Sequence, residues 1–227
     1  MTKPVLTLFD LDHTLLSGDS DVLWCDFLVA KGILERESFT TRNADMETRY
    51  KAGIVGAQEF CDFYVGTLAG RTPQQWEPLR REFLASEVVP RIPVAASQLV
   101  RTHRAAGDLV VMTTATNRFI TELTAQHFDI EHLLATETEM ADGAFTGRTT
   151  GILNMREGKV ERLETWLAAR GQPLDHFHSC AYSDSMNDLA LLEAVDAPVA
   201  VDPDPRLAAI AQARGWPILH LHARPLS

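Results

Sequence analysis

The sequence predicts an α/β fold, in which a Rossmann-like parallel sheet is flanked by helices and interrupted by an inserted helical cap. Short apolar runs alternate with segments of helical periodicity along most of the chain, and this alternation favours α/β architecture. Residues 17 to 89 instead show helical periods without an apolar run typical of a parallel strand. With 227 residues and 45% hydrophobic composition, the chain can bury a sizeable core.

The predicted strands are continuous apolar runs, which are typical of parallel strands covered on both faces. We expect strands at residues 5 to 9, 109 to 113, 179 to 182 and 198 to 201. A β-hairpin is expected over the Asp142-Gly143 turn, because an Asp-Gly pair favours the left-handed backbone of a tight turn.

Helices are expected between these strands. Residues 93 to 107 begin with a proline and end at a glycine, and we expect Val94 and Val100 on one buried stripe. Residues 159 to 171 show the same periodicity and also end at a glycine. Thr116 is a candidate N-cap of the helix that follows the second strand.

The chain is expected to divide into a core, residues 1–16 and 90–227, and a helical cap, residues 17–89. Within the cap, Trp24 and Phe27 share one face of a predicted helix. The return to the core is expected near the prolines that precede the helix at 93 to 107.

Composition excludes several classes of partner. A formal net charge of -10 argues against nucleic acid and against an anionic membrane surface, because both need a basic footprint. No apolar run reaches the roughly 18 residues of a transmembrane helix, and the first residues lack the pattern of a signal peptide. We therefore expect a cytoplasmic protein. The spacing of Cys25, Cys61 and Cys180 predicts neither disulfides nor a thiolate metal site.

Two aspartates follow the first predicted strand with one residue between them. On an extended backbone, Asp10 and Asp12 point to the same side and can face one pocket. Two adjacent carboxylates repel unless they share a proton or a cation lies between them. The pair alone is more typical of an acidic loop after a strand, so its interpretation depends on the other strand ends.

Polar side chains also follow the other predicted strands, where an open α/β sheet places its ligand crevice. Thr114 follows the second strand, and its hydroxyl is a candidate hydrogen-bond donor to an anion. Lys159 begins a helix, where a cation opposes the macrodipole, which makes another role a candidate; considered alone, it is more typical of a solvated surface lysine. Asp184, Asn187 and Asp188 lie within one turn of a strand-to-helix junction.

Taken in order, these motifs resemble those of the haloacid dehalogenase superfamily of aspartate-nucleophile phosphatases. "FDLDHTL" is similar to its first motif, Thr114 to its second, Lys159 to its third and "SDSMNDL" to its fourth. The helical insertion between the first two motifs resembles the cap of the subgroup that contains phosphoserine phosphatases. The resemblance implies a magnesium-dependent phosphatase that hydrolyses a small phosphorylated metabolite through an aspartyl-phosphate.

The resemblance also implies a role for each matching residue. Asp10 attacks phosphorus, which divides one displacement into two easier steps. Asp12 protonates the leaving alkoxide and later takes a proton from the attacking water. Thr114 and Lys159 hold the phosphoryl oxygens.

Magnesium is the implied cofactor, because this hard cation prefers oxygen ligands and retains waters. Asp10, the backbone carbonyl of Asp12 and Asp184 are the expected ligands. Asn187 and Asp188 are expected to complete or orient the site around them.

The substrate is open at this point. In phosphoserine phosphatases a cap glutamate holds the substrate's amino group and a cap arginine its carboxylate; here Asp19 and Arg49 are the candidates. Trp24 and Tyr64 are candidate walls for a larger or aromatic leaving group, such as that of histidinol phosphate, although a Trp or Tyr at helical spacing is more often part of the core. Ser183 stands where the family often has glycine before the fourth-motif aspartate, and it strains the backbone if φ there is positive.

Three other functions compete with hydrolysis of a phosphomonoester. A phosphotransferase uses the same intermediate but passes the phosphoryl group to an acceptor hydroxyl. A dehalogenase attacks carbon and needs neither Asp12 nor Asp184, so these residues argue against it. A phosphorylatable or phosphate-binding module without turnover has no use for a general base at Asp12.

Overall fold

Seven strands form one sheet in the part of the chain that the computed structural model describes, residues 3–52 and 54–222. Their order across the sheet is β4-β3-β2-β1-β5-β6-β7, and β4 runs antiparallel to β3 while the other neighbouring pairs are parallel. The strands are β1 Val5–Phe9, β2 Leu109–Asn117, β3 His132–Ala141, β4 Ala144–Thr150, β5 His178–Ser183, β6 Ala197–Val201 and β7 Ile218–Leu219. The predicted α/β fold with a largely parallel sheet is therefore confirmed.

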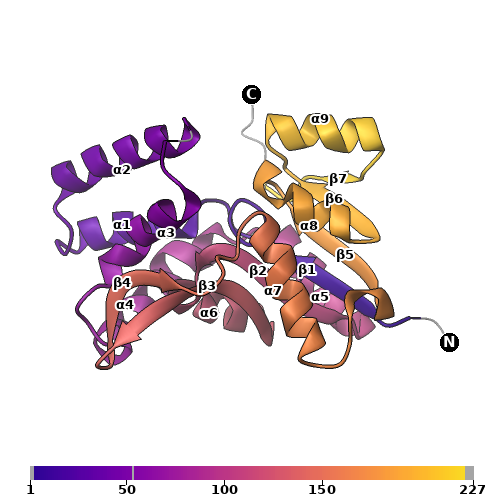
Figure 1. Ribbon diagram of the computed structural model, residues 1–227, viewed down its shortest axis with the longest axis horizontal. Coiled ribbons are helices and arrows are strands. Elements are labelled where there is room, and N and C mark those ends of the chain that lie inside the picture. Colours follow the sequence, from indigo (N-terminus) through magenta and orange to yellow (C-terminus); the bar gives the residue numbers. More distant parts are fainter. Residues whose placement is uncertain (1–2, 53, 223–227) are drawn as a thin grey trace.

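Helices flank this sheet and also gather beyond one of its ends (Figure 1). The first group lies between β1 and β2 in the chain: α1 Ser20–Ala30, α2 Arg36–Lys51, α3 Ala57–Val65, α4 Pro73–Phe83 and α5 Val94–Ala106. The later helices are α6 Arg118–His127, α7 Glu157–Ala168, α8 Leu189–Ala194 and α9 Pro205–Arg214. Short helical turns cover Gly66–Leu68, Leu84–Val88, Val89–Arg91, Leu174–His176 and Met186–Asp188.

Alternation along β1 divides the core between the two faces of the sheet. Leu6 and Leu8 pack with Leu163 and other apolar residues of α7, α8 and α9 on one face. Phe9 points to the other face and packs in a cluster with Val100 of α5 and residues of α6. Because successive side chains of a strand point to opposite faces, the continuous apolar run predicted at 5 to 9 suits a doubly covered strand.

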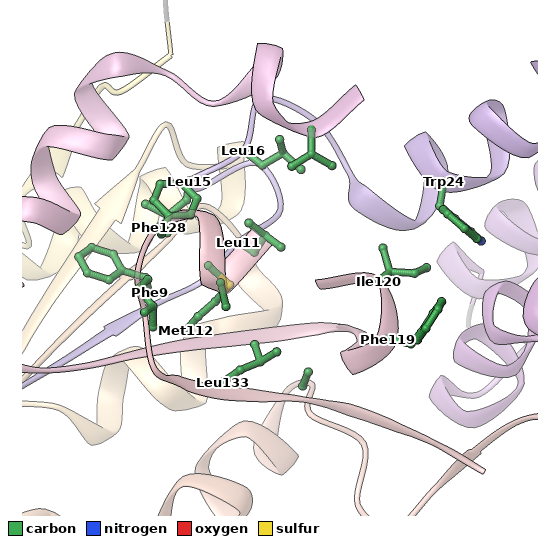
Figure 2. Packing of buried hydrophobic residues seen from close by; sticks show 14 of the residues in the cluster. Phe9, Leu11, Leu15, Leu16, Trp24, Met112, Phe119, Ile120, Phe128 and Leu133 are labelled. Atoms are coloured by element: carbon green, nitrogen blue, oxygen red, sulfur yellow. The ribbon is translucent and has the colours of Figure 1, made fainter. Parts of the chain in front are cut away.

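The hydrophobic cluster of Phe9 continues into the helices that precede α5. Figure 2 shows Trp24 of α1 in the same cluster as Phe119 and Ile120 of α6. Helices α1 to α4 occupy much of the stretch predicted to be a cap, and they pack on the sheet-covering helices through apolar side chains. The boundaries of that cap stay a prediction.

The tight turn between β3 and β4 is the predicted hairpin. Asp142 has φ of 50° and Gly143 φ of 78°, so both residues take the left-handed backbone that an Asp-Gly pair tolerates.

Two local predictions are wrong. Val94 is 71% exposed, because six residues of helix turn it about 120° away from Val100; Ala96, one helical turn before Val100, is buried instead. Thr116 is not an N-cap: it belongs to β2, and the side chain of Asn117 caps α6 by accepting a hydrogen bond from the Ile120 amide.

The three cysteines are buried and free. Over the described ranges, no helix combines the length and the apolar character needed to cross a membrane.

Candidate active site

The neighbouring parallel strands β1 and β5 end at the same edge of the sheet, so the residues that follow them lie close together. Phe9 pairs with Tyr182, and the Asp10 amide donates to the Tyr182 carbonyl at 3.0 Å. Asp10 and Asp184 both line a cavity of about 960 Å³ between this edge of the sheet and the helices α1 to α3. The fold thus brings the first and fourth sequence motifs to one place.

Lys159 lies in the centre of this acidic group. Its Nζ donates to Asp10 Oδ1 at 2.8 Å and to Asp188 Oδ2 at 2.6 Å, and its side chain is 2% exposed. Burial opposes the charge, but the two carboxylates outweigh it and raise the pKa of Lys159 above its ordinary value. The lysine stays charged.

Helix periodicity explains how a lysine reaches so buried a place. Lys159, Leu163 and Leu167 are spaced by four residues, so they share the face of α7 that packs on the sheet. Lys159 is at the N-terminal end of this face, next to the strand ends. A cation at the N-terminus of a helix is repelled by the helix dipole, and the attraction of the two carboxylates offsets this repulsion.

Asp10 and Asp184 are held close together by one threonine. The Thr14 hydroxyl lies 3.1 Å from Asp10 Oδ2 and 3.1 Å from Asp184 Oδ1. A hydroxyl has one proton and satisfies one of these oxygens at a time. Burial raises the pKa of Asp10 to about 7, against the opposing charge of Lys159. Burial and then the charge of Asp10 raise the pKa of Asp184 to about 8.

Asp12 faces a different set of partners. Its carboxylate accepts hydrogen bonds from the Ser20 amide at 2.7 Å and from the Thr116 hydroxyl at 2.9 Å. The Thr114 hydroxyl contacts the same carboxylate at 3.3 Å. Burial and then the nearby charge of Asp19 raise the pKa of Asp12, which favours its protonated form.

Thr114 differs from its predicted place. It is fully buried and does not line the cavity, because its hydroxyl points to Asp12; Thr116, two residues further along β2, lines the cavity instead. Thr116, which the sequence suggested as a helix cap, therefore lies at the cavity wall beside Asp12.

The fourth motif has Ser183 where the family often has glycine, and the backbone there accommodates a serine. Ser183 lies in extended β5 and is not among the described residues with positive φ, so the expected strain is absent. Its hydroxyl donates to Asp188 Oδ2 at 2.8 Å. Asp188 is thereby held between Ser183 and Lys159, while Asn187 is exposed and lines the cavity.

The donor chemistry of this group fits a hard divalent cation. Asp10, Asp12, Asp184 and Asp188 bring four carboxylates against the single ammonium of Lys159, and magnesium prefers oxygen ligands. Within 3–52 and 54–222, no group of three or more His, Cys, Asp or Glu side chains is arranged around a metal position. Asp10 and Asp184 share the Thr14 hydroxyl and both line the cavity, and magnesium is commonly bound by one or two carboxylates.

Two of the predicted substrate contacts lie outside the cavity, whereas Tyr64 lines it. Trp24 is fully buried and does not line the cavity; it stacks on Phe27 and donates from Nε1 to the Thr67 hydroxyl at 3.2 Å. Arg49 also lies away from the cavity, paired with acidic side chains of α2 and α3. Trp24 fills the aromatic core between helices, where its large apolar surface is best buried.

Asp19, the remaining predicted contact, lines the cavity but has a structural task as well. Its carboxylate accepts a hydrogen bond from the Val22 amide at 3.0 Å and caps α1.

Sequence reasoning missed Thr14, Asp21 and Arg156. Thr14 belongs to the quoted first motif, four residues after Asp10, and this spacing was the available signal. Asp21 is typical of an acidic residue in the first turn of a helix, so nothing in the sequence marked it. Arg156 precedes α7 with φ of 52° and donates to the Tyr50 hydroxyl at 2.8 Å, joining two walls of the cavity.

Comparisons with known proteins agree with this geometry. A family model described as haloacid dehalogenase-like hydrolase matches residues 7–193. A histidinol-phosphatase of Neisseria meningitidis is 36% identical over 217 residues, which are 95% of this chain and 98% of that protein. A phosphoserine phosphatase of Mycobacterium tuberculosis is 30% identical, over 92% of this chain and 68% of that protein. A crystal structure of a protein of unknown function from Bordetella pertussis superposes with a TM-score of 0.93 at 45% identity, over 97% of this chain and 100% of that one.

Proposed function

Because the chain belongs to the haloacid dehalogenase-like hydrolase family, we propose that it is a magnesium-dependent phosphatase of small phosphomonoesters. The observation that carries the proposal is the contact of Lys159 with Asp10, in a cavity that Asp184 also lines. A carboxylate can approach an anionic phosphate when cationic groups screen the repulsion between them. Lys159 supplies one such cation at hydrogen-bond distance from the proposed nucleophile.

Asp10 is the nucleophile in this mechanism. One of its carboxylate oxygens forms a bond to phosphorus while the bond from phosphorus to the alcohol oxygen breaks, giving an aspartyl-phosphate. Protonated Asp12 gives its proton to the leaving alkoxide. In the second step Asp12 takes a proton from water, whose oxygen attacks phosphorus and releases phosphate from Asp10. Burial, which raises the pKa of Asp12, favours the protonated state needed at the start.

Asp10, the backbone carbonyl of Asp12 and Asp184 would hold magnesium, with Asn187 and Asp188 beside them. When bound, magnesium supplies positive charge that stabilises the phosphoryl oxygens and keeps the acidic side chains ionised. Lys159 and Thr116 would contact phosphoryl oxygens, and Thr114 would orient Asp12 from behind.

The helices of residues 17–89 would act as the cap over the core of residues 1–16 and 90–227. The Arg156 to Tyr50 hydrogen bond spans from the segment before α7 to α2. A cover of this kind limits the access of water during the first step.

The first candidate substrate is histidinol phosphate, with phosphoserine second. A histidinol-phosphatase resembles this chain over nearly the full length of both proteins. For phosphoserine, the predicted carboxylate contact through Arg49 is missing, because Arg49 does not line the cavity.

The test is phosphate release from a panel of phosphomonoesters that contains both candidates and phenyl phosphate, with magnesium or with a chelator. Asp10→Asn keeps the shape of the side chain and removes its nucleophile, and we expect a loss of at least about 10³-fold. Asp175→Asn is the matched control, because Asp175 is exposed on a short helical turn away from the cavity.

Acid quenching followed by mass spectrometry of the intact protein tests the intermediate. We expect one added phosphoryl group on the wild type and on Asp175→Asn, and none on Asp10→Asn. An active Asp10→Asn variant would overturn the mechanism. Transfer of phosphate to an added alcohol without release of free phosphate would favour the phosphotransferase.

A further inference from the structure

The segment that follows β7, residues 220–222, reaches the loop after the proposed nucleophile. Nε2 of His222 lies 2.8 Å from the carbonyl of His13 and 3.2 Å from the carbonyl of Thr14. We propose that His222 is a positioning residue for the reaction: it holds this loop and thereby the hydroxyl of Thr14, which contacts the nucleophile Asp10. The inference rests on the proposed phosphatase function and adds to it a residue from outside the cavity.

The imidazole is the donor in this contact. A carbonyl oxygen only accepts hydrogen bonds, so Nε2 of His222 carries the proton. Over the described ranges, Nδ1 of the same ring is buried and has no hydrogen-bond partner. Burial of an unpaired nitrogen costs free energy, so the ring is poorly placed for stability alone. Its contact with the loop accounts for the placement.

The loop requires a support of this kind, because part of its backbone is strained. His13 has φ of 56°, a left-handed conformation that is uncommon for residues other than glycine. Such a conformation persists where the surrounding structure holds it. Thr14 follows directly and is fully buried, and its hydroxyl lies 3.1 Å from Asp10 Oδ2 and 3.1 Å from Asp184 Oδ1. A shift of the loop would therefore move a contact that both carboxylates share.

Asp202, which follows β6, fixes the segment of His222 from its other side. Its Oδ2 accepts hydrogen bonds from the amides of Leu221 at 2.8 Å and His222 at 3.0 Å. Its Oδ1 lies 2.8 Å from Nδ1 of His220, and its own amide donates to the Leu219 carbonyl at 2.9 Å. Hydrogen bonds to a carboxylate are among the stronger ones in proteins. Groups that do not line the active-site cavity thus position the His222 ring, which can serve as a fixed point for the loop.

The experiment removes the Nε2 donor and then restores it. His222→Leu has a side chain of similar size without a donor, whereas the amide of His222→Gln can place an N–H near the position of Nε2. We expect kcat of His222→Leu to fall by about tenfold on histidinol phosphate and phenyl phosphate alike, with KM changed by less than about twofold. His222→Gln should recover at least about half of the wild-type kcat. His222→Phe, a ring without a donor, repeats the test if His222→Leu does not fold.

Magnesium binding gives a second readout, which needs no turnover. The Thr14 hydroxyl contacts Asp10 and Asp184, the two carboxylates proposed to hold the cation. An ion that binds the folded state raises the melting temperature according to its concentration and affinity. We expect His222→Leu to need about three- to tenfold more magnesium than the wild type for the same rise in melting temperature. A loss of stability alone would lower the melting temperature at every magnesium concentration without this shift.

His178→Leu is the matched control, because His178 is an exposed histidine at the start of β5, at the strand end opposite to Asp184. Its imidazole also lies near an aspartate, with Nδ1 3.7 Å from Asp196 Oδ2. We expect the wild-type kcat and the wild-type magnesium dependence from it. A loss in His178→Leu equal to that in His222→Leu would overturn the inference.

The other outcomes separate this inference from the proposed function. Wild-type kcat and magnesium dependence in His222→Leu would overturn the inference and leave the phosphatase intact. An equal loss in His222→Gln would mean that the N–H is not what holds the loop, and it would overturn the inference as well. If the wild type hydrolyses no ester, the proposed function fails, and the shift in magnesium dependence of the melting temperature alone then decides whether His222 holds the two carboxylates.

Discussion

The two ends of the cavity differ in chemistry and in origin. At the sheet edge, Asp10, Lys159 and the half-buried Asp184 are titratable side chains that lie close together, held by contacts among the strand ends and α7. At the other end, helices α2 and α3 supply the rings of Tyr50 and Tyr64. The first wall suits a reaction that needs a fixed charge distribution, and the second suits recognition of the alcohol group. The proposed function therefore assigns the reaction to the first wall and recognition of the alcohol to the second.

Lys159→Met removes the cation from the wall assigned to the reaction, and we expect it to have the largest effect on activity. The variant leaves Asp10 and Asp188 without their cation, so burial raises the pKa of Asp10 further and protonates the nucleophile. We expect kcat to fall by about 10²- to 10³-fold on every ester in the panel, including phenyl phosphate.

Lys31→Met is the control for that change, because Lys31 forms a partly exposed ion pair with Glu82 of α4. We expect near wild-type rates from it. If Lys159→Met lost activity on amine-containing esters alone, the lysine would belong to recognition, and the division between the two walls would be wrong.

A smaller effect is expected in the pH dependence of stability. Burial and Asp10 raise the folded-state pKa of Asp184 to about 8, above its ordinary value near 3.8. A carboxyl group whose pKa is higher in the folded than in the unfolded state binds its proton more tightly in the folded protein. Its contribution to the free energy of unfolding is full below pH 4 and is lost as the pH rises toward 8. In chelator, we expect the wild-type melting temperature to fall relative to Asp184→Asn between pH 5 and pH 9, by at least about 3 °C.

Magnesium should reduce this pH dependence in the wild type, because a cation stabilises the ionised carboxylates. Melting curves recorded with and without magnesium test both statements. Parallel curves for wild type and Asp184→Asn in chelator would show that Asp184 has an ordinary pKa.

The smallest effect concerns recognition at the cap. Arg156 lines the cavity and donates to Tyr50, whereas Arg49 is paired with Asp45 and Glu59 outside it. We expect Arg156→Ala to raise KM by about three- to tenfold with a small change in kcat, since it loosens one hydrogen bond. Arg49→Ala is its matched control and should change neither. Steady-state kinetics on the best ester would decide, and an effect of Arg49→Ala alone would restore the predicted role of Arg49.

Sequence patterns predicted more of the sheet than of the cap. Apolar runs locate strands well because a parallel strand must bury both faces, and the expected run at 109 to 113 proved to be the first part of a longer β2. Helix periodicity placed Trp24 and Phe27 on one face, but it did not show what that face contacts: Trp24, suggested for the pocket by the family resemblance, packs among Phe27, Trp76 and Phe83. An aromatic stripe on a helix has the same pattern whether it faces a core or a cavity.

The sequence by itself determined the α/β class and the identity of the acidic and basic residues at the strand ends. It did so because strand ends and motif spacing are local properties, and the carboxyl ends of parallel strands meet at one edge. The tertiary structure decided which side chains share a hydrogen bond: Thr116 joins Asp12 to Asp21, and Ser183 supports Asp188. Those contacts depend on where separate elements pack, and no pattern within one element contains that information.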